Sequence, residues 1–335
     1  MSVIGSVDCG FLATYQGKAD ALWVDPIKNI DLVGDVEAAK AVLENQQVTF
    51  TEITGKKDRT LSLEWLQKCD VSTTACTDDC DIDGEDATPI CKEYTIECLR
   101  ESAFKVPKRA YRERTIEMAE AFAFNMAQHK TALDEWLAQY IVTGILANAG
   151  TNAFIGGVGT VAAALTTIPA ANWDDSIWGY FNRVIRGNKF KSPYLLTGDN
   201  LYQLIFNRMH ESMTEAGKAG MAKIGSIRKI YQDPENVEVI APNTSFLIHK
   251  TAVAFANKAY YPLGASNAVP EAGIYAMWSE QSNNIPGVYY DIITKETCVS
   301  NEFYLAAKVQ LHGVFATNPY PCDETNTGIL AFSCV

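Results

Sequence analysis

An alternation of aspartates in the first third of the chain is the pattern closest to a metal site. Asp79, Asp81, Asp83 and Gly84 match the opening of a calcium loop, in which short carboxylates at alternating positions converge on one hard cation. The twelfth position is Ile90, where the loop needs a bidentate Glu. This excludes the helix-flanked calcium site. Two interpretations stay open, a solvated acidic loop and a weak calcium site shared at an interface.

A glycine pattern in the middle of the chain suggests nucleotide chemistry. Gly157, Gly159 and Ala162 spell G-x-G-x-x-A, which in dinucleotide-binding domains follows a strand and opens a helix. Here the pattern comes after a long helical segment, and the next acid, Asp174, starts another helix. We therefore expect a flexible loop, and a soluble dinucleotide-dependent enzyme that uses this loop is kept as an alternative.

Histidines and cysteines give no further site. The four histidines are scattered singly, without the paired spacing of metal ligands: His129, His210, His249 and His312. Five of the nine cysteines cluster, but no His lies among them and no second matching pair follows: Cys69, Cys76, Cys80, Cys91 and Cys98. The start of the chain has no basic segment before an apolar run, which predicts synthesis in the cytoplasm and mostly free thiols. We predict no catalytic residue, no cofactor-binding residue and no metal ligand.

The charge distribution limits the partners. A formal net charge of -12 argues against tight binding of nucleic acid by the chain as a whole, because phosphate affinity comes mainly from Lys and Arg. The densest basic segment contains Lys105, Lys108, Arg109, Arg112 and Arg114. It fits either nucleic acid or an acidic protein surface. The stretch 136–173 has no charged residue, but glycines, asparagines and a proline interrupt it, so we expect no membrane span.

A long amphipathic helix is the strongest structural signal. Between residues 111 and 148, apolar and aromatic residues recur every three or four positions, among them Phe122, Met126 and Trp136, while Glu113, Glu120 and other charged residues occupy other faces. Such a helix would be about 50 Å long, so a compact domain would bury only part of it. The remaining contacts must come from neighbouring elements or neighbouring subunits.

The segments around this helix predict an α+β protein. Residues 1–46 contain one helical run at 36–45 and form an arm. Residues 47–65 and 91–104 alternate apolar and polar side chains around an acid-rich excursion, which predicts a hairpin with an exposed acidic tip. After the helix come a helix capped by Asp174 or Asp175, the strand SPYLLTG, a helix from Asp199 and short strands within VEVIAPNTSFLIHKTAVAFANKA. The chain ends in a two-strand pattern around a turn at 295–300 and a last strand, GILAFSCV.

This order of elements resembles the major capsid proteins of tailed double-stranded-DNA phages, which have the Johnson or Hong Kong ninety-seven fold. The resemblance covers nearly the whole chain and includes the PYLLTGDNLYQLI run and the ending VQLHGVFATNPYPC. It implies an N-terminal arm at 1–46, an extended hairpin or E-loop at 47–104, a P-domain with a spine helix at 105–161, a mixed α/β A-domain at 162–286 and returning P-domain strands at 287–335. The cross-linking chemistry of that family is not implied, because no motif identifies partners for Lys56 and Lys57 in the hairpin.

The resemblance implies a structural protein and no enzyme. The expected function is that of a subunit which self-assembles, through hexamers and pentamers, into an icosahedral capsid around a phage double-stranded DNA genome, and the expected location is the virion. The expected partners are copies of the chain, other capsid or scaffold proteins, and packaged DNA by weak non-specific contact, with no membrane. For the basic segment, the acidic hairpin tip of an adjacent subunit is the favoured partner. Another virion protein, of the tail or an adhesin, is a further alternative.

Overall fold

The structure is a computed structural model that describes most of the chain. The described residues are 9–24, 34–46, 50–52, 60–65, 90–109, 118–151, 160–162, 164–174, 176–199, 201, 204, 227, 229–271, 274–299, 302–318 and 327–334. The chain forms two compact units, each built from separated segments. Unit 1 contains Met1–Lys40, Ile96–Tyr140 and Ala256–Val314, and unit 2 contains Ala41–Thr95, Ile141–Phe255 and Phe315–Val335.

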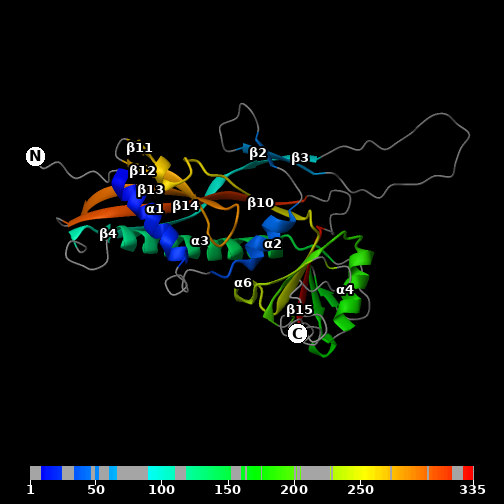
Figure 1. The fold of residues 1–335 in the computed structure, drawn as a ribbon. Coiled ribbons are helices and arrows are strands. Elements are labelled where there is room, and N and C mark those ends of the chain that lie inside the picture. The colour runs from blue at the N-terminus through cyan, green and yellow to red at the C-terminus, as the bar shows by residue number, and fades with distance from the viewer. Residues whose placement is uncertain are drawn as a thin grey trace, which may run out of the picture. The chain divides into compact units, whose positions relative to one another are not determined.

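The chain contains both helices and runs of consecutive strands (Figure 1). The first half contains α1 (Cys9–Val24), α2 (Glu37–Asn45), β1 (Phe50–Glu52), β2 (Thr60–Trp65), β3 (Ile90–Thr95), β4 (Glu97–Pro107) and α3 (Met118–Ala147). The second half contains β5 (Thr160–Ala162), β6 (Leu165–Ile168), η3 (Ala170–Asn172), α4 (Ser176–Gly187), β7 (Tyr194–Thr197), β8 (Lys229–Gln232), α6 (Pro234–Ile240), β9 (Thr244–Ile248), β10 (Val253–Asn257), η4 (Ala265–Asn267), β11 (Val269–Glu271), β12 (Ile274–Gln281), β13 (Tyr289–Val299), β14 (Glu302–Thr317) and β15 (Ile329–Cys334).

Unit 1 is built around an antiparallel sheet and the helix α3. Within unit 1 the strand order is β14-β13-β12-β11, and β4 also pairs with β14. On β14 every second side chain is buried, from Leu305 to Leu311, because successive side chains of a strand point to opposite faces. One face packs on α3, where Phe104 of β4 lies 5.2 Å from Phe122 between ring centroids. Figure 1 shows α3 running beside β4 and β14.

The N-terminal segment also contributes to unit 1 through α1, a helix that the sequence did not predict. Its buried residues include Leu12, Tyr15 and Leu22. The Tyr15 ring contacts the rings of Phe122 and Trp278 edge-on, at 5.3 and 5.9 Å between centroids. The segment expected as an arm therefore places side chains in the core of unit 1.

Unit 2 contains a second sheet with the order β5-β6-β15-β9-β7-β8. The helix α4 buries its apolar stripe on this sheet, with Phe181 5.0 Å from Phe332 between ring centroids. The Asp174 carboxylate accepts hydrogen bonds from the backbone N–H and the hydroxyl of Ser176, at 2.9 and 2.5 Å. The helix begins at Ser176, two residues after Asp174, and ends at Gly187, which confirms its predicted end.

The base of the predicted hairpin forms its own antiparallel sheet, with the order β1-β2-β3. Leu61 and Leu63 of β2 are buried, and Leu63 packs with Ala254 and Ala316 in unit 2. The acid-rich excursion lies outside the described residues. One difference from the expectation is that the run 91–104 is not a single hairpin strand, because β3 pairs with β2 whereas β4 pairs with β14. Ile96 is buried at the point where the strand changes sheets.

Three further segments differ from the sequence interpretation. The residues VEVI, expected as a strand, lie in α6, which starts at Pro234 after an Asp233 side chain that caps the N–H of Asn236 at 3.2 Å. The described helix α3 spans 118–147, and residues 111–117 of the predicted helix lie outside the described residues. The last strand, β15, pairs with β6 and β9 of unit 2, although it falls in the range expected for returning P-domain strands. Its apolar alternation does not specify a partner strand.

Candidate functional site

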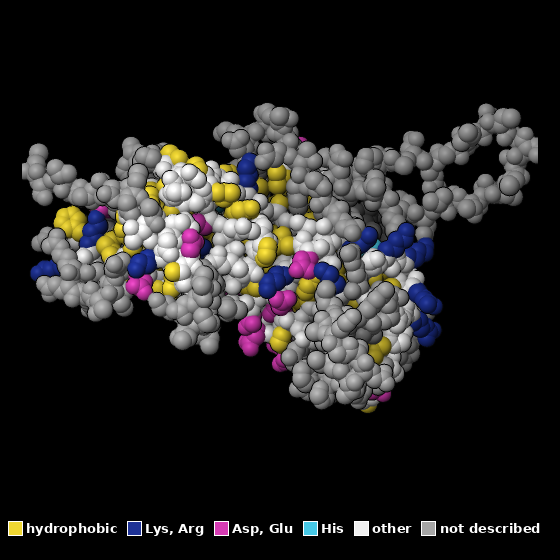
Figure 2. All heavy atoms as spheres, viewed as in Figure 1, with side chains coloured by type: hydrophobic (Ala, Val, Ile, Leu, Met, Phe, Trp, Pro, Cys, Tyr) yellow, Lys and Arg dark blue, Asp and Glu magenta, His cyan; other side chains and the backbone are white. Residues whose placement is uncertain are grey.

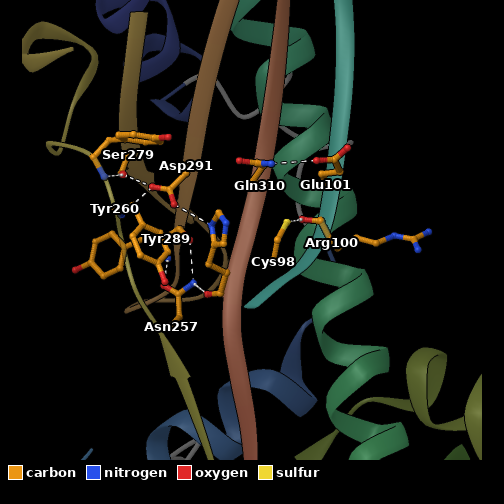
Figure 3. A network of polar contacts seen from close by, with 11 residues as sticks. Cys98, Arg100, Glu101, Asn257, Tyr260, Ser279, Tyr289, Asp291 and Gln310 are labelled. Atoms are coloured by element: carbon orange, nitrogen blue, oxygen red, sulfur yellow. Dashed lines mark hydrogen bonds and ion pairs between the residues drawn. The ribbon is translucent and has the colours of Figure 1, made fainter. Parts of the chain in front are cut away.

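A buried Ser–Asp–His group in unit 1 is the arrangement closest to catalytic chemistry (Figure 3). The Ser279 hydroxyl on β12 donates a 2.5 Å hydrogen bond to Oδ1 of Asp291 on β13. On β14, Nδ1 of His312 lies 2.9 Å from Oδ2 of Asp291, without the alignment of a hydrogen bond. The backbone N–H of Tyr260 donates to Asp291 Oδ1 at 3.0 Å. All three side chains are buried.

The order of these contacts does not support nucleophilic catalysis. In a serine hydrolase the histidine stands between the serine and the acid, because it must take the hydroxyl proton. Here the Asp291 carboxylate stands between Ser279 and His312, so the Ser279 hydroxyl and the His312 ring each contact the carboxylate. The group instead joins three neighbouring strands to the segment that contains Tyr260. Ser279 also accepts from the N–H of Tyr261 at 3.2 Å through its hydroxyl oxygen.

A second connection lies beside this group and is also structural (Figure 3). The Asn257 amide donates to the backbone oxygens of Tyr289 and His312, at 3.0 and 2.7 Å, and accepts from the N–H of Tyr289 at 2.7 Å. The side chain thus satisfies backbone groups that the strand ladders leave open, which is the usual reason for a partly buried asparagine.

A buried ion pair fixes α3 to β12 and α1. The Lys130 ammonium of α3 donates to Oε2 of Glu280 at 2.8 Å, and the Tyr15 hydroxyl and the Trp278 indole N–H both donate to Oε1 at 2.8 Å. Only 8% and 10% of the Lys130 and Glu280 side chains are exposed. Burial raises the pKa of the Glu280 carboxyl, but the Lys130 charge and the three donors outweigh it, so the pKa lies below its ordinary value. The carboxylate is therefore held ionised inside unit 1.

One turn further along α3, a second buried acid contacts the same end of the sheet, where Tyr290 of β13 pairs with Glu280 of β12. Asp134 accepts hydrogen bonds from the hydroxyls of Tyr290 and Ser282 and, at 3.1 Å, from the Asn284 amide. Burial outweighs these donors and raises the pKa of Asp134. Asp134 is one of the charged residues of this helix that were expected on faces other than the apolar one, yet it is buried. The sequence feature that could have indicated this burial is the i, i+4 spacing of Lys130 and Asp134, which puts both side chains on one helix face.

The other side of α3 meets β4 through a histidine and an aromatic pair. His129 stacks on Phe104 at 4.9 Å between centroids, and its Nδ1 lies 2.5 Å from the Ser102 hydroxyl oxygen. Burial lowers the pKa of His129. Trp136 stacks on Tyr140 at 5.2 Å, and both are half-buried. Phe122 is fully buried as expected, whereas Trp136 keeps part of its surface exposed.

The basic segment is only partly described. Lys105 and Arg109 are exposed, and Lys108 forms an ion pair with Glu296. The face seen in Figure 2 carries Lys and Arg side chains in small groups among Asp and Glu side chains. Several other residues singled out in the sequence lie outside the described residues: Lys56, Lys57, Asp79, Asp81, Asp83, Arg112, Arg114, Gly157, Gly159 and His210.

The described residues after the glycine pattern test the nucleotide-binding alternative. In a dinucleotide fingerprint the residues after the second glycine open a helix, whose N-terminus binds the pyrophosphate. Here Thr160–Ala162 is the strand β5, which pairs antiparallel with β6. The local structure is thus a hairpin, and the helix N-terminus that the chemistry requires does not follow the pattern.

Two findings concern metals and membranes. Within the described ranges, no group of three or more His, Cys, Asp or Glu side chains is arranged to hold a metal ion. Of the helices in the described part of the chain, none is long and apolar enough to cross a bilayer. In the described part of the chain, Cys98, Cys298 and Cys334 form no disulfide bond.

Comparisons with known proteins give structural similarity without sequence similarity. No protein-family model and no curated protein sequence matches the chain. A capsid chain of cyanophage P-SCSP1u is similar over 88% of this chain and 89% of its own length, with 11% identity and a TM-score of 0.49. A chain of Mycobacterium phage Bobi is similar over 89% and 90%, with 14% identity and a TM-score of 0.49. A chain of the capsid asymmetric unit of cyanophage Pam1 is similar over 83% and 85%, with 11% identity and a TM-score of 0.48.

Proposed function

We propose that this chain is the structural subunit of a phage capsid, which self-assembles through hexamers and pentamers into an icosahedral shell around double-stranded DNA. The observation that carries the proposal is the architecture of the chain itself. A helix of 30 residues, about 45 Å long, continues from unit 1 into unit 2, because the division between the units falls after Tyr140. Two helices and a three-stranded sheet precede this helix, and a six-stranded sheet with its covering helix and the two long strands β13 and β14 follow it.

The use of the buried polar groups supports the same proposal. The groups of Glu280, Asp134 and Asp291 each connect segments that are far apart in the sequence. Both carboxylate oxygens of Glu280 and of Asp134 accept hydrogen bonds from protein donors, and Asp291 accepts them through Oδ1. A catalytic acid or base needs an approach for substrate and a proton to exchange with it. A shell subunit needs rigid connections between its segments, and the observed contacts supply them.

In this proposal the exposed hairpin reaches a neighbouring copy, and its acidic tip contacts the basic segment that includes Arg109. The hairpin sheet is attached to unit 2 through β2, while Lys92, Glu93 and Thr95 of β3 are exposed. Packaged DNA is a weaker partner, because the net charge of -12 opposes phosphate binding. The place of the protein is then the virion.

Negative-stain electron microscopy of the purified chain tests the proposal. We expect closed shells or rings of capsomers, and we expect deletion of residues 73–88 to leave circular dichroism unchanged while abolishing these particles. A wild-type chain that forms only a small oligomer and melts at a higher temperature with NAD would support the enzyme alternative. A deletion variant that does not fold would place the hairpin in the core and contradict the proposed reach to a neighbour.

A charge-reversal series tests the proposed contact of the acidic tip. Changing Arg109 and Arg112 to Glu should weaken assembly, and also changing Asp81 and Asp83 to Lys in the same chain should restore part of it. Because exposed pairs are screened, the effect should shrink as the Debye length falls from about 10 Å at 0.1 M to about 3 Å at 1 M salt. If the fourfold variant assembles no better than the Arg109 and Arg112 variant, the tip does not contact the basic segment.

A further inference from the structure

The edge of the unit 1 sheet at β4 offers a second contact between copies. β4 is 11 residues long and pairs with β14 on one side, and no described strand pairs with its other side. An open edge of this length presents backbone N–H and C=O groups that can pair with another strand.

Two features limit the part of this edge that can pair with another strand. They lie at equal distances along β4 from one residue, Ala103. At one end, Cys98 and Arg100 pair with the adjacent residues His312 and Leu311, so Leu99 is a bulge. At the other end, Pro107 has no backbone N–H. The regular edge therefore runs from residue 100 to residue 106, and its midpoint is Ala103.

On the exposed face of β4, an acidic and a basic residue lie at equal distances on either side of the same midpoint. Glu101 and Lys105 lie two residues on either side of Ala103, and all three are exposed. Residues at this spacing lie on the same face of a strand. In an antiparallel pair of two β4 strands centred on Ala103, Glu101 of each copy stands opposite Lys105 of the other, and two small alanines face each other at the centre. Opposite charges in directly opposed positions stabilise a strand pair, and like charges destabilise it.

We propose that β4 pairs with β4 of a second copy of this chain, antiparallel and centred on Ala103. Each copy contributes the same surface, which is the requirement for a two-fold contact. This inference rests on the proposed function in one respect, which is that a shell brings copies of the chain side by side. The contact itself needs no other protein. It differs from the proposed contact of the hairpin tip, which involves Arg109 beyond the end of β4.

Disulfide trapping in the full chain tests the register. Directly opposed residues of antiparallel strands have Cα atoms about 4.5 or 5.5 Å apart, and both values allow a disulfide. Ala103→Cys should therefore give a covalent dimer on mild oxidation, above the background of the nine native cysteines. Glu101→Cys is the matched control, because its own copies would be four residues, about 13 Å, apart along the strands. A mixture of Glu101→Cys and Lys105→Cys chains should cross-link, although each variant alone should not.

Charge reversal gives a second, non-covalent measurement. With Lys105→Glu, an acidic residue stands opposite Glu101 of the other copy at both positions of the two-fold pair. Self-association measured by sedimentation velocity should therefore weaken about three- to ten-fold. Adding Glu101→Lys to Lys105→Glu should restore association, even though Glu101 then loses its contact with Lys308. Restoration supports the register, and a double variant that associates no better than Lys105→Glu overturns it.

The outcomes separate this inference from the proposed function. Shells without an Ala103→Cys cross-link overturn the β4 contact and leave the capsid proposal standing. A cross-linked dimer without any shells supports the β4 contact and contradicts the capsid proposal. If neither shells nor the cross-link form, both are wrong.

Discussion

The buried ion pair between Lys130 and Glu280 allows a quantitative prediction. Lys130→Met removes the positive charge and keeps most of the apolar stem, so Glu280 stays buried without its counter-charge. Removing one member of a buried pair costs about 3–5 kcal/mol of unfolding free energy. With an unfolding entropy of about 2.1 cal/mol/K per residue, a chain of 335 residues loses about 1.4 °C per kcal/mol, so the melting temperature should fall by about 4–7 °C. Calorimetry of the unassembled chain at pH 7 measures this change.

A matched control and a double variant separate the charge effect from packing. Lys308→Met breaks the Lys308–Glu101 pair, whose side chains are 44% and 51% exposed, and should cost less than about 1 kcal/mol. Lys130→Met combined with Glu280→Gln should recover most of the lost stability, because no unpaired charge is left and the amide oxygen still accepts from Tyr15 and Trp278. If Lys130→Met costs no more than Lys308→Met, the ion pair does not hold α3 in place.

The pH dependence of the same variant has a definite sign. In the wild type the pKa of Glu280 is lowered, so the pair contributes stability above the unfolded pKa of about 4.3, and this stability is lost as the pH falls through the folded pKa. In Lys130→Met, burial without a counter-charge raises the pKa of Glu280. The ionised carboxylate then costs stability at pH 7, and acidification relieves the cost by protonation. The difference between variant and wild type should therefore shrink from pH 7 to pH 5.

Two further predictions concern α3 and its neighbours. Gly144→Ala should destabilise the chain by about 1–3 kcal/mol, because the new Cβ would lie 2.6 Å from the Phe315 ring. Gly179→Ala in α4 is the control, since its Cβ meets nothing within 4 Å and should stabilise the chain by about 0.5–1 kcal/mol. Equal melting temperatures for the two variants would contradict this prediction. Burial lowers the pKa of His129, so wild-type stability should fall as the pH drops from about 6.5 through the folded pKa. His129→Gln should lose less stability than wild type between pH 7.5 and pH 5.5, and an equal loss would show that His129 does not contribute.

The local elements were largely readable from the sequence. The period of the apolar residues identified α3, and the aspartate at position 174 indicated the start of α4 to within two residues, because periodicity and capping act within one or two turns. The same local logic was available but missed at α6, where Asp233 and Pro234 form a helix start. The acidic loop and the two glycines of the glycine pattern lie outside the described residues, so the sites expected there stay predictions.

What the sequence by itself determined is the type of several local elements, among them the long helix α3, the amphipathic helix α4 and the buried strand β7, whereas α1 and α6 were missed. The tertiary structure alone decided which strands pair, so that β4 leaves the hairpin for β14 and β15 joins β6 and β9. It also decided that Lys130 and Asp134 are buried rather than solvated. The physical reason is that an alternating strand or an amphipathic helix specifies which face is apolar but not which distant segment covers it. A charge on such a face becomes interpretable only when its partner, here Glu280 or Tyr290, is brought to it by the fold.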